Sequence, residues 1–415
     1  MPDLSEFCEP GSPITYGVVQ PGPTDPNGVK FIRGGDVSDG KIAESELRTI
    51  SAEVSNQYKR TILRGGELLV SLVGNPGEVA LVPSHMAGLN IARQVAMVRL
   101  SNQINSKFLM YFLMSPMGRS ALGAQAIGSV QSVINLRDLK RVEVPNIERS
   151  TQDKIAEILG TLDDKIELNR RMNETLEEMA RALFRDWFVE FGPTRRQMAM
   201  KEKGIATDPA AIMGHAFPPE KAATLAPLFP TKLGDDGLPE GWETRDLRSA
   251  LTLNYGKSLT KKARRPGPFN VFGSGGISGT HDTALAKGPS IIVGRKGTVG
   301  SLYWTREDFY AIDTVFYVTS DYPMVYCHRL LETLGLETMN TDAAVPGLNR
   351  DNAYRQEFAF GGDALIHAYA EFVGNLTEKS DANQQENQTL AEMRDLLLPK
   401  LMSGEIRLKD AEAAE

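Results

Sequence analysis

Residues 155–187 read IAEILGTLDDKIELNRRMNETLEEMARALFRDW, and residues 369–401 read YAEFVGNLTEKSDANQQENQTLAEMRDLLLPKL. The two stretches align at a constant shift of 214 positions without a gap, and twelve of their thirty-three positions are identical. The same shift places Asn135 on Asn349, just upstream. An internal repeat determines the architecture of a chain, so the sequence is interpreted as a duplication.

A weaker repeat precedes each of these stretches. The apolar run 67–73 leads into Gly74-Asn75-Pro76-Gly77, and the run 290–293 leads, after a short interval, into Gly297-Thr298-Val299-Gly300. An apolar run followed by a Gly-x-x-Gly turn is typical of β-structure. The segment between the repeats is rich in Ala and Pro and predicts an extended, partly ordered connection. The predicted order is a β-rich unit at 1–148, a long helix at 149–191, an extended linker at 192–241, a second β-rich unit at 242–362, a second long helix at 363–404 and an acidic tail at 405–415.

Both predicted helices carry a seam of mostly apolar residues in alternating steps of four and three. Such a pattern favours an antiparallel or parallel coiled coil, and a polar residue within it fixes the register. Antiparallel packing would let the two asparagines of one helix face those of the other. The alternative is two independent helices, each packed on its own domain. The central seam residues are Leu162, Ile166, Asn169, Asn173 and Leu176 in the first helix and Leu376, Asn383, Asn387 and Leu390 in the second.

The net charge of −7 conceals a segregation of charge along the chain. Residues 247–305 contain nine basic residues and one acid, a balance of +8, and residues 59–141 contain ten basic residues and three acids, a balance of +7. Residues 150–192 carry six basic and ten acidic residues, and residues 363–415 carry five and eleven. A phosphate-binding surface requires this local asymmetry, so nucleic acid is a candidate partner despite the total charge.

The composition excludes several classes of protein. The 415 residues with 41% hydrophobic and 24% charged residues indicate a globular chain of two to three domains. Two cysteines argue against a disulfide framework, and no long apolar stretch suggests a membrane span, so we expect a cytoplasmic protein. No Gly-x-x-x-x-Gly-Lys-Ser/Thr loop, adenine-methyltransferase tetrad, His-x-x-x-His pair or zinc site occurs in the sequence. We therefore expect no catalysis by this chain.

Candidate DNA-binding residues lie in the two basic windows and in the turns. In the second unit, basic side chains of one loop suit phosphates, which give affinity without sequence information: Lys257, Lys261, Lys262, Arg264 and Arg265. Others lie on Gly-rich loops that could approach a groove, where Arg or Lys pairs with guanine: Ser274, His281, Arg295, Lys296 and Thr298. The comparable polar residues of the first unit, where Asn and Gln suit adenine, are Thr15, Tyr16, Arg33, Asn75, Arg93, Gln94 and Gln131. The alternative is that these residues are solvated or structural.

Over essentially its whole length the chain resembles the specificity (S) subunit of type I restriction-modification systems. The most specific likeness is in the first helix, in residues 152–159 (QDKIAEIL), 162–169 (LDDKIELN), 175–177 (TLE) and 183–188 (LFRDWF). The second helix is similar through 386–390 (ENQTL) and 398–406 (LPKLMSGEI). The second β-rich unit is similar at 238–243 (LPEGWE), 294–300 (GRKGTVG) and 312–315 (IDTV). The first unit departs from the pattern, because it lacks a counterpart of Trp242.

The resemblance implies an α+β fold with two β-rich target recognition domains, joined by two long helices in an antiparallel coiled coil with pseudo-twofold symmetry. It implies that each domain reads half of a split site in double-stranded DNA. The helices would set the spacer as a ruler and bind two modification subunits, which bring S-adenosylmethionine. Restriction subunits would bring ATP and Mg, and this chain itself would hold no cofactor. The alternative function is a coiled-coil adaptor that scaffolds protein partners without reading bases.

Overall fold

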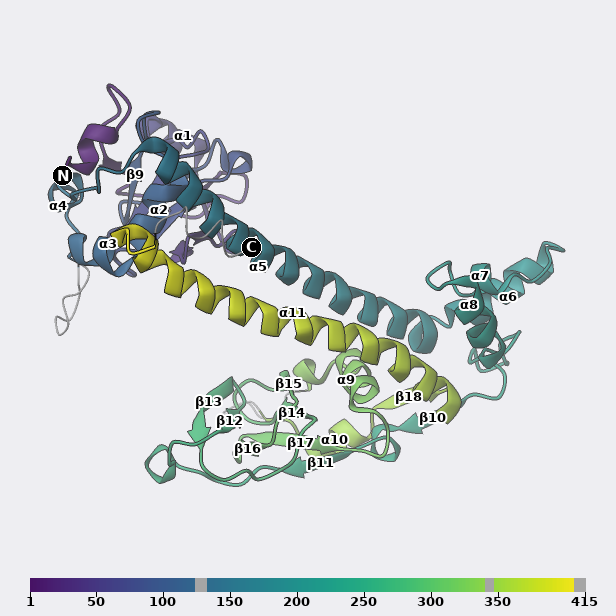
Figure 1. Ribbon diagram of the computed structural model, residues 1–415. Helices are drawn as coiled ribbons and strands as arrows, with labels where there is room; N and C mark the ends of the chain where they lie inside the picture. The colour runs from purple at the N-terminus through teal and green to yellow at the C-terminus, as the bar shows by residue number, and fades with distance from the viewer. Residues whose placement is uncertain (124–132, 340–346, 407–415) are drawn as a thin grey trace. The chain divides into compact units, whose positions relative to one another are not determined.

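The computed structural model describes residues 1–123, 133–339 and 347–406 of the chain, which divides into two compact units (Figure 1). Unit 1 comprises Met1–Arg170 and Gln384–Glu415, and unit 2 comprises Arg171–Asn383. Two long helices, α5 (Arg149–Phe184) and α11 (Asp363–Ser403), each contribute one portion to each unit. Each unit therefore contains a β-rich domain and a pair of helix segments from distant parts of the sequence.

The domain of unit 1 is built on two small sheets. The four-stranded antiparallel sheet has the order β1 (Thr15–Tyr16), β9 (Val95–Val98), β6 (Leu68–Ser71), β7 (Val79–Leu81). The three-stranded sheet has the order β5 (Arg48–Ile50), β2 (Val29–Ile32), β8 (Asn90–Ile91), with β2 and β8 parallel. A hairpin, β3 (Val37–Ser38) and β4 (Lys41–Ile42), follows β2. The helices are α1 (Ala52–Gln57), α2 (Ser106–Met114), α3 (Pro116–Ala121) and α4 (Leu136–Lys140).

The domain of unit 2 repeats this topology. Its four-stranded sheet has the order β11 (Thr252–Tyr255), β17 (Val315–Thr319), β14 (Ser290–Gly294), β15 (Leu302–Thr305). Its three-stranded sheet has the order β13 (Gly276–His281), β12 (Phe269–Gly273), β16 (Phe309–Ala311), again with one parallel pair, β12 and β16. The helices α9 (Met324–Thr333) and α10 (Arg350–Tyr354) take the places of α2 and α4. The predicted α+β duplication is confirmed.

The Gly-x-x-Gly turns that suggested the repeat are equivalent in the two domains. Gly74 and Gly77 join β6 to β7 with φ of 99° and 90°, and Gly297 and Gly300 join β14 to β15 with φ of 87° and 70°. Only glycine adopts these angles without strain. The N–H of Gly77 donates to Ser71 O at 2.9 Å, and the N–H of Gly300 donates to Gly294 O at the same distance. The two turns therefore have the same length and the same closing hydrogen bond.

The entry to each domain has the same strand register in the two units. In unit 2, β10 (Glu243–Asp246) pairs with β18 (Glu357–Phe360), with Asp246 opposite Glu357. In unit 1 an isolated bridge joins Asp3 to Glu143, which lies 214 positions before Glu357. Asp3 thus stands in the register of Asp246.

The long helices run antiparallel in each unit, and their asparagines meet as predicted. In unit 1, Asn169 Nδ2 donates to Asn387 Oδ1 at 3.0 Å. In unit 2, Asn383 Nδ2 donates to Asn173 Oδ1 at 2.8 Å. Asn169 and Asn383 are each 1% exposed, and the apolar seam residues around them are buried or half-buried. The alternative of two helices that pack independently is therefore wrong.

The segment 192–241, predicted as an extended linker, is instead half helical and part of a core. It contains α6 (Gly192–Glu202), α7 (Pro209–Ile212) and α8 (Pro219–Leu225). Each of these helices has proline in its first turn, where the missing N–H costs nothing. Phe217 and Phe229 pack on the fully buried Trp187, with ring centroids 6.0 and 5.1 Å away. The prolines were interpreted as a sign of extended chain, whereas they occupy the first turns of these helices.

The end of the first long helix also differs from the predicted boundary at residue 191. The α-helical part of α5 ends at Phe184, and a π-helical turn continues over Arg185–Val189. The wider turn accompanies the burial of Trp187 and Phe188 in the same core as Tyr369 of α11. The second helix ends at Ser403, one residue before its predicted boundary.

Each β-rich domain is anchored to the helix pair of its own unit through one short helix. The sixth residue of α2, Tyr111, donates its OH to Asp163 Oδ2 of α5 at 2.6 Å. The sixth residue of α9, Arg329, donates to both carboxylate oxygens of Glu177 of α5 at 2.7 and 2.6 Å. Burial opposes the charge on Glu177, but the hydrogen bonds and charge of Arg329 prevail and hold the pKa of this carboxyl below its ordinary value.

Replacing Asn383 by leucine tests the amide pairing in the seam. Asn383→Leu removes the hydrogen bond to Asn173 inside a desolvated seam, so we expect the free energy of unfolding to fall by about 1–3 kcal/mol. Urea denaturation measures the loss. Gln385→Leu, on the exposed side of the same helix, is the control and should change stability by about 0.5 kcal/mol or less. Equal effects of the two substitutions would contradict a structural role for the buried amides.

Replacing Glu177 by glutamine tests the anchor of unit 2 through pH. Glu177→Gln should lower stability by about 1–2 kcal/mol at pH 7, less than for a fully buried pair, because the Glu177 side chain is 43% exposed. A carboxyl with a lowered pKa contributes stability above its unfolded pKa and loses it as pH falls through its folded pKa. The difference from wild type should therefore shrink as pH falls below about 4.5, the ordinary value for glutamate. Glu178→Gln, at an exposed neighbour, should produce no such pH-dependent difference.

Candidate nucleic-acid interface

In unit 2, three loops meet at one edge of the domain, and two of them carry predicted DNA-binding residues. The backbone N–H groups of Arg295 and Lys296, after β14, both donate to Thr314 O in the loop before β17, at 2.9 and 3.0 Å. Ser301 Oγ, at the start of β15, donates to Ser274 O in the turn between β12 and β13 at 2.9 Å. Ser274, Arg295, Lys296 and Thr298 therefore lie together on surface loops, as predicted from their Gly-rich context.

An exposed tyrosine lies between two guanidinium groups at this edge. The ring centroid of Tyr255 is 4.9 Å from Arg295 Cζ and 4.7 Å from Arg350 Cζ, and Tyr255 is 47% exposed. The cation–π contacts and a hydrogen bond from Arg295 Nη1 to Asp313 O at 3.0 Å hold the Arg295 fork. Guanidinium and aromatic groups arranged in this way offer planar donors and a stacking face to a base or a phosphate.

Tyr255 and Arg350 were not among the residues selected from sequence. Arg350 lies outside the basic window 247–305, and Tyr255 is uncharged. A signal for Tyr255 did exist in its counterpart in the other domain. Tyr16 pairs with Ala96 on β9 as Tyr255 pairs with Phe316 on β17, and Tyr16 is 46% exposed. The shift between them is not 214, because the loops of the two domains differ in length.

The edge of unit 1 that corresponds to this one also gathers predicted residues. The N–H of Leu72 donates to Gln94 O at 2.7 Å, as the N–H of Arg295 does to Thr314 O in unit 2. A Cβ on Gly34, next to Arg33, would lie 3.3 Å from Gln94 Cβ, so the β2 end and the β8–β9 loop are in close contact. Asn75, in the Gly-x-x-Gly turn, and Arg93 are exposed. These residues thus share one edge with Tyr16.

Several predicted residues have structural partners instead of a free surface. His281 is 7% exposed, and its Nδ1 accepts the N–H of Arg265 at 3.1 Å, so its side chain is buried and not on a groove-facing loop. Arg33 donates to both carboxylate oxygens of Asp36 at 3.0 and 2.7 Å. Thr15 Oγ1 donates to the backbone O of Tyr16 at 3.3 Å. Gln131 lies outside the described residues.

The basic loop after β11 contains two kinds of residue. Lys257, Lys261 and Lys262 are exposed on the surface, which suits contacts to phosphates. Arg264 Nη1 instead donates to Ser278 O at 2.6 Å, and Arg265 Nε donates to Asp282 Oδ2 at 2.6 Å. The hydrogen bond from Arg265 lowers the pKa of Asp282, so this pair stays charged. The two arginines thus brace the loop on which the lysines stand.

Among residues 1–123, 133–339 and 347–406 no group of three or more His, Cys, Asp or Glu side chains could hold a metal ion. Burial raises the pKa of the Cys327 thiol to about 11 and also raises the pKa of the Cys8 thiol, which makes both poor nucleophiles. In the same described part of the chain, no helix has the length and apolar character needed to cross a membrane.

Comparisons with known proteins agree with this geometry. The family model for the type I restriction modification DNA specificity domain matches residues 21–178. The HindI type I restriction enzyme specificity subunit of Haemophilus influenzae is 27% identical over 442 residues, which cover 91% of this chain and 94% of that protein. The EcoBI specificity subunit of Escherichia coli is 36% identical over 143 residues, which cover 34% of this chain and 30% of that protein.

The fold has a counterpart among solved structures. The S subunit of a type I restriction-modification system from M. genitalium matches over 96% of this chain and 95% of its own length, with a TM-score of 0.53 and 17% identity. The duplicated domains and paired helices are therefore a known arrangement. The resemblance noted in the helices is confirmed: residues 21–178 match the DNA specificity domain, and nearly the whole chain is similar to type I restriction enzyme specificity subunits.

Proposed function

We propose that this chain is the DNA-recognition subunit of a type I restriction-modification complex, in which each β-rich domain reads one half of a bipartite site. The observation that carries the proposal is the equivalence of the two domain edges. Each has an exposed tyrosine at the end of the first strand of its sheet, a Gly-x-x-Gly turn and a neighbouring loop with polar side chains. A duplicated reader suits the repeated groove faces of duplex DNA.

The two edges differ in the groups that they present, and we propose that they read different bases. In unit 2, Arg295 and Arg350 offer guanidinium forks of the kind that pair with guanine O6 and N7. Lys257, Lys261 and Lys262 would neutralise phosphates and position the domain. In unit 1, Asn75 and Gln94 supply amides, which suit adenine. Each domain would thus combine non-specific affinity with a distinct base preference.

The helix pair is proposed to set the spacer between the half-sites and to bind two modification subunits. In support of docking, Met179 on α5 and Met393 on α11 are identical residues of the repeat and are 45% and 46% exposed. Leu168 and Leu396 add exposures of 55% and 60%. Exposed apolar side chains on a solvated helix suit a protein partner. Modification subunits would bring S-adenosylmethionine, and restriction subunits would bring ATP and Mg; this chain contributes recognition only.

Substitutions in unit 2 separate base contacts from phosphate contacts. The full-length chain with its modification subunits first selects a bipartite site from a pool of random DNA duplexes. Competition binding then measures the affinity for this site relative to sites with one altered half. Arg295→Ala should weaken discrimination at one half-site by roughly tenfold, the effect of losing one bidentate base contact. Lys261→Ala should weaken binding to all sequences and reduce the salt dependence by about one phosphate contact.

The outcomes distinguish the proposed function from the adaptor. A wild-type complex without any sequence preference at physiological salt would favour a scaffold that does not read bases. Uniform loss of binding in Arg295→Ala would make this residue a phosphate contact and leave the reading of unit 2 to other side chains.

An insertion into both helices tests the ruler. Seven residues are added after Arg171 and after Gln385, which are equivalent positions of the repeat, so that each asparagine pair remains within its own unit. Seven helical residues rise about 10 Å, or about three base pairs at 3.4 Å each. The spacer of the selected site should lengthen by that amount with both half-sites unchanged. The same insertion after the exposed Gly204 is the control and should leave the spacer unaltered. An unchanged spacer in the helix variant would contradict the proposal.

A further inference from the structure

Unit 1 contains a hairpin between β2 and β5 that has no equivalent between the corresponding strands of unit 2, β12 and β13, which the structure describes throughout. In unit 1 the equivalent strands β2 and β5 are separated by residues 33–47, which include the hairpin β3–β4 with Asp39 and Gly40 at its tip. In unit 2 the corresponding strands, β12 and β13, are joined directly by Ser274 and Gly275. This difference gives the two domains different connections to their helix pairs.

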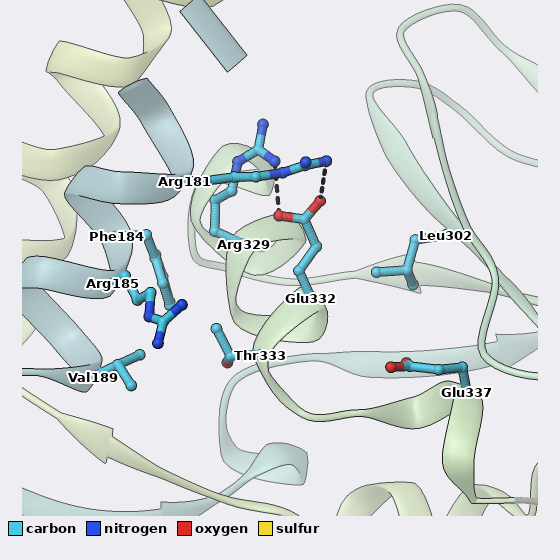
Figure 2. A pocket seen from close by; sticks show the side chains of 9 residues that line it. All are labelled: Arg181, Phe184, Arg185, Val189, Leu302, Arg329, Glu332, Thr333 and Glu337. Carbon is cyan, nitrogen blue, oxygen red and sulfur yellow. Dashed lines mark hydrogen bonds and ion pairs between the residues drawn. The ribbon is translucent and has the colours of Figure 1, made fainter. Parts of the chain in front are cut away.

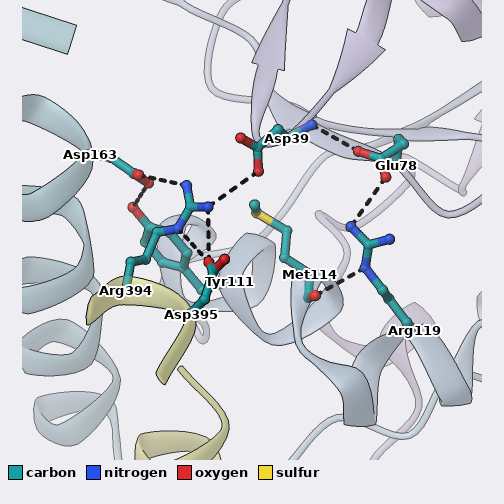
Figure 3. A network of polar contacts seen from close by, with 8 residues as sticks. All are labelled: Asp39, Glu78, Tyr111, Met114, Arg119, Asp163, Arg394 and Asp395. Atoms are coloured by element: carbon teal, nitrogen blue, oxygen red, sulfur yellow. Dashed lines mark hydrogen bonds and ion pairs between the residues drawn. The ribbon is translucent and has the colours of Figure 1, made fainter. Parts of the chain in front are cut away.

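The tip of the hairpin contacts both long helices of unit 1, and Figure 3 shows its contact with Arg394 of α11. Lys41 forms an ion pair with Glu167 of α5. Asp39 Oδ1 lies 3.6 Å from Arg394 Nη2 of α11. The Arg394 side chain is 12% exposed, and its Nη1 donates to Asp163 Oδ1 of α5 at 2.9 Å. Although Asp39 is largely exposed, its partner is therefore fixed in the seam.

The same tip holds the Gly-x-x-Gly turn between β6 and β7 through Glu78. The N–H of Asp39 donates to Glu78 Oε2 at 2.8 Å, and Arg119 Nη2 donates to Glu78 Oε1 at 3.1 Å (Figure 3). The N–H of Glu78 donates to Asn75 O at 3.2 Å, and Glu78 O accepts the N–H of Ser71 at 2.8 Å. Glu78 thus closes the turn that carries Asn75, and its carboxylate is held from two sides.

The corresponding turn of unit 2 is held differently. Ser301 takes the place of Glu78, and its Oγ donates to Ser274 O at 2.9 Å and to Thr298 O at 3.0 Å, within the domain. The place that the hairpin takes in unit 1 corresponds to part of a pocket of about 710 Å³ in unit 2, lined by Arg181, Leu302 and Glu332 among others (Figure 2). Leu302 corresponds to Val79, which accepts the N–H of Gly40, and Glu332 corresponds to Met114, which packs against Gly40.

We infer that Glu78 and Arg119 are positioning residues for the base-reading turn of unit 1, and that the β3–β4 hairpin couples this turn to the helix pair through Arg394. The inference rests on the proposed function. It makes reading of the first half-site sensitive to the helix surface on which partner subunits are proposed to dock. Among the described residues, the turn of unit 2 has no such hairpin: it is braced by Ser301 and packs at Gly300 against Leu336 and Glu337 of its own domain.

The experiment measures discrimination at each half-site separately. The half-site weakened by Arg295→Ala belongs to unit 2, which identifies the other as that of unit 1. Glu78→Ala and Arg119→Gln, in the full-length chain with its modification subunits, should each reduce discrimination at the first half-site by roughly tenfold. Discrimination at the second half-site should stay within about twofold of wild type. Arg394→Gln should cause a smaller loss, about threefold, at the first half-site only.

Controls separate positioning from folding. Arg181→Gln removes a guanidinium that joins α5 to Glu332 of α9 in unit 2, and it should alter discrimination at neither half-site. Glu78→Gln is the milder substitution, used if Glu78→Ala does not fold. It keeps an oxygen for the N–H of Asp39 and removes the charge that pairs with Arg119, so its loss of discrimination should be intermediate. Thermal unfolding confirms that each measured variant is native.

The outcomes are distinguishable from failure of the proposed function. If the wild-type complex has no sequence preference, the proposed function itself is wrong. If wild type discriminates but Glu78→Gln and Arg119→Gln change neither half-site, or weaken both equally, the positioning role is overturned. If they act as expected while Arg394→Gln has no effect, the turn is positioned locally and the coupling to the helix pair is wrong.

Discussion

The structure depends on two buried amide pairs in the helix seam. Asn169 pairs with Asn387, and Asn173 pairs with Asn383. Since Asn383 and Asn387 are the repeat equivalents of Asn169 and Asn173, one antiparallel register satisfies both pairs at once. A slip of one heptad would leave desolvated amides without these partners, at about 1–3 kcal/mol each. The polar residues therefore select a register that an uninterrupted leucine seam would leave less defined.

That register determines how the chain is divided. Because α5 and α11 run antiparallel, each β-rich domain packs on the start of the helix that follows it and on the end of the other helix. The core of unit 1 includes Leu68 and Phe108 of its domain with Ile155 of α5 and Leu401 of α11. The helices α2 and α9 anchor the two domains to α5 through equivalent positions. Their sixth residues have diverged to Tyr111 and Arg329, yet both still bond a carboxylate of α5.

Sequence patterns predicted the parts of the molecule that are periodic or repeated. The seam and the equivalent Gly-x-x-Gly turns follow from spacing, because helix and turn geometry are local. The pairing of the asparagines was predicted only for helices that pack antiparallel. The helices between residues 192 and 229 were missed, since Pro193, Pro209 and Pro219 look like breakers until their first-turn positions are known. His281 was selected for its side chain, but its burial depends on the fold around it. Tyr255 and Arg350 come together only through tertiary packing.

The two β-rich domains share their strand order but differ in the loops at the edges that are proposed to bind DNA. Strand order and turn geometry are the same in both domains, whereas the residues between the strands differ in length and chemistry. A turn braced by Ser301 depends on contacts within its own domain. A turn braced by Glu78 shares its contacts with a hairpin that reaches Arg394 and Glu167. Two copies of one fold can therefore respond unequally to the same change in the helix pair, because the connection lies in an insertion that only one copy contains.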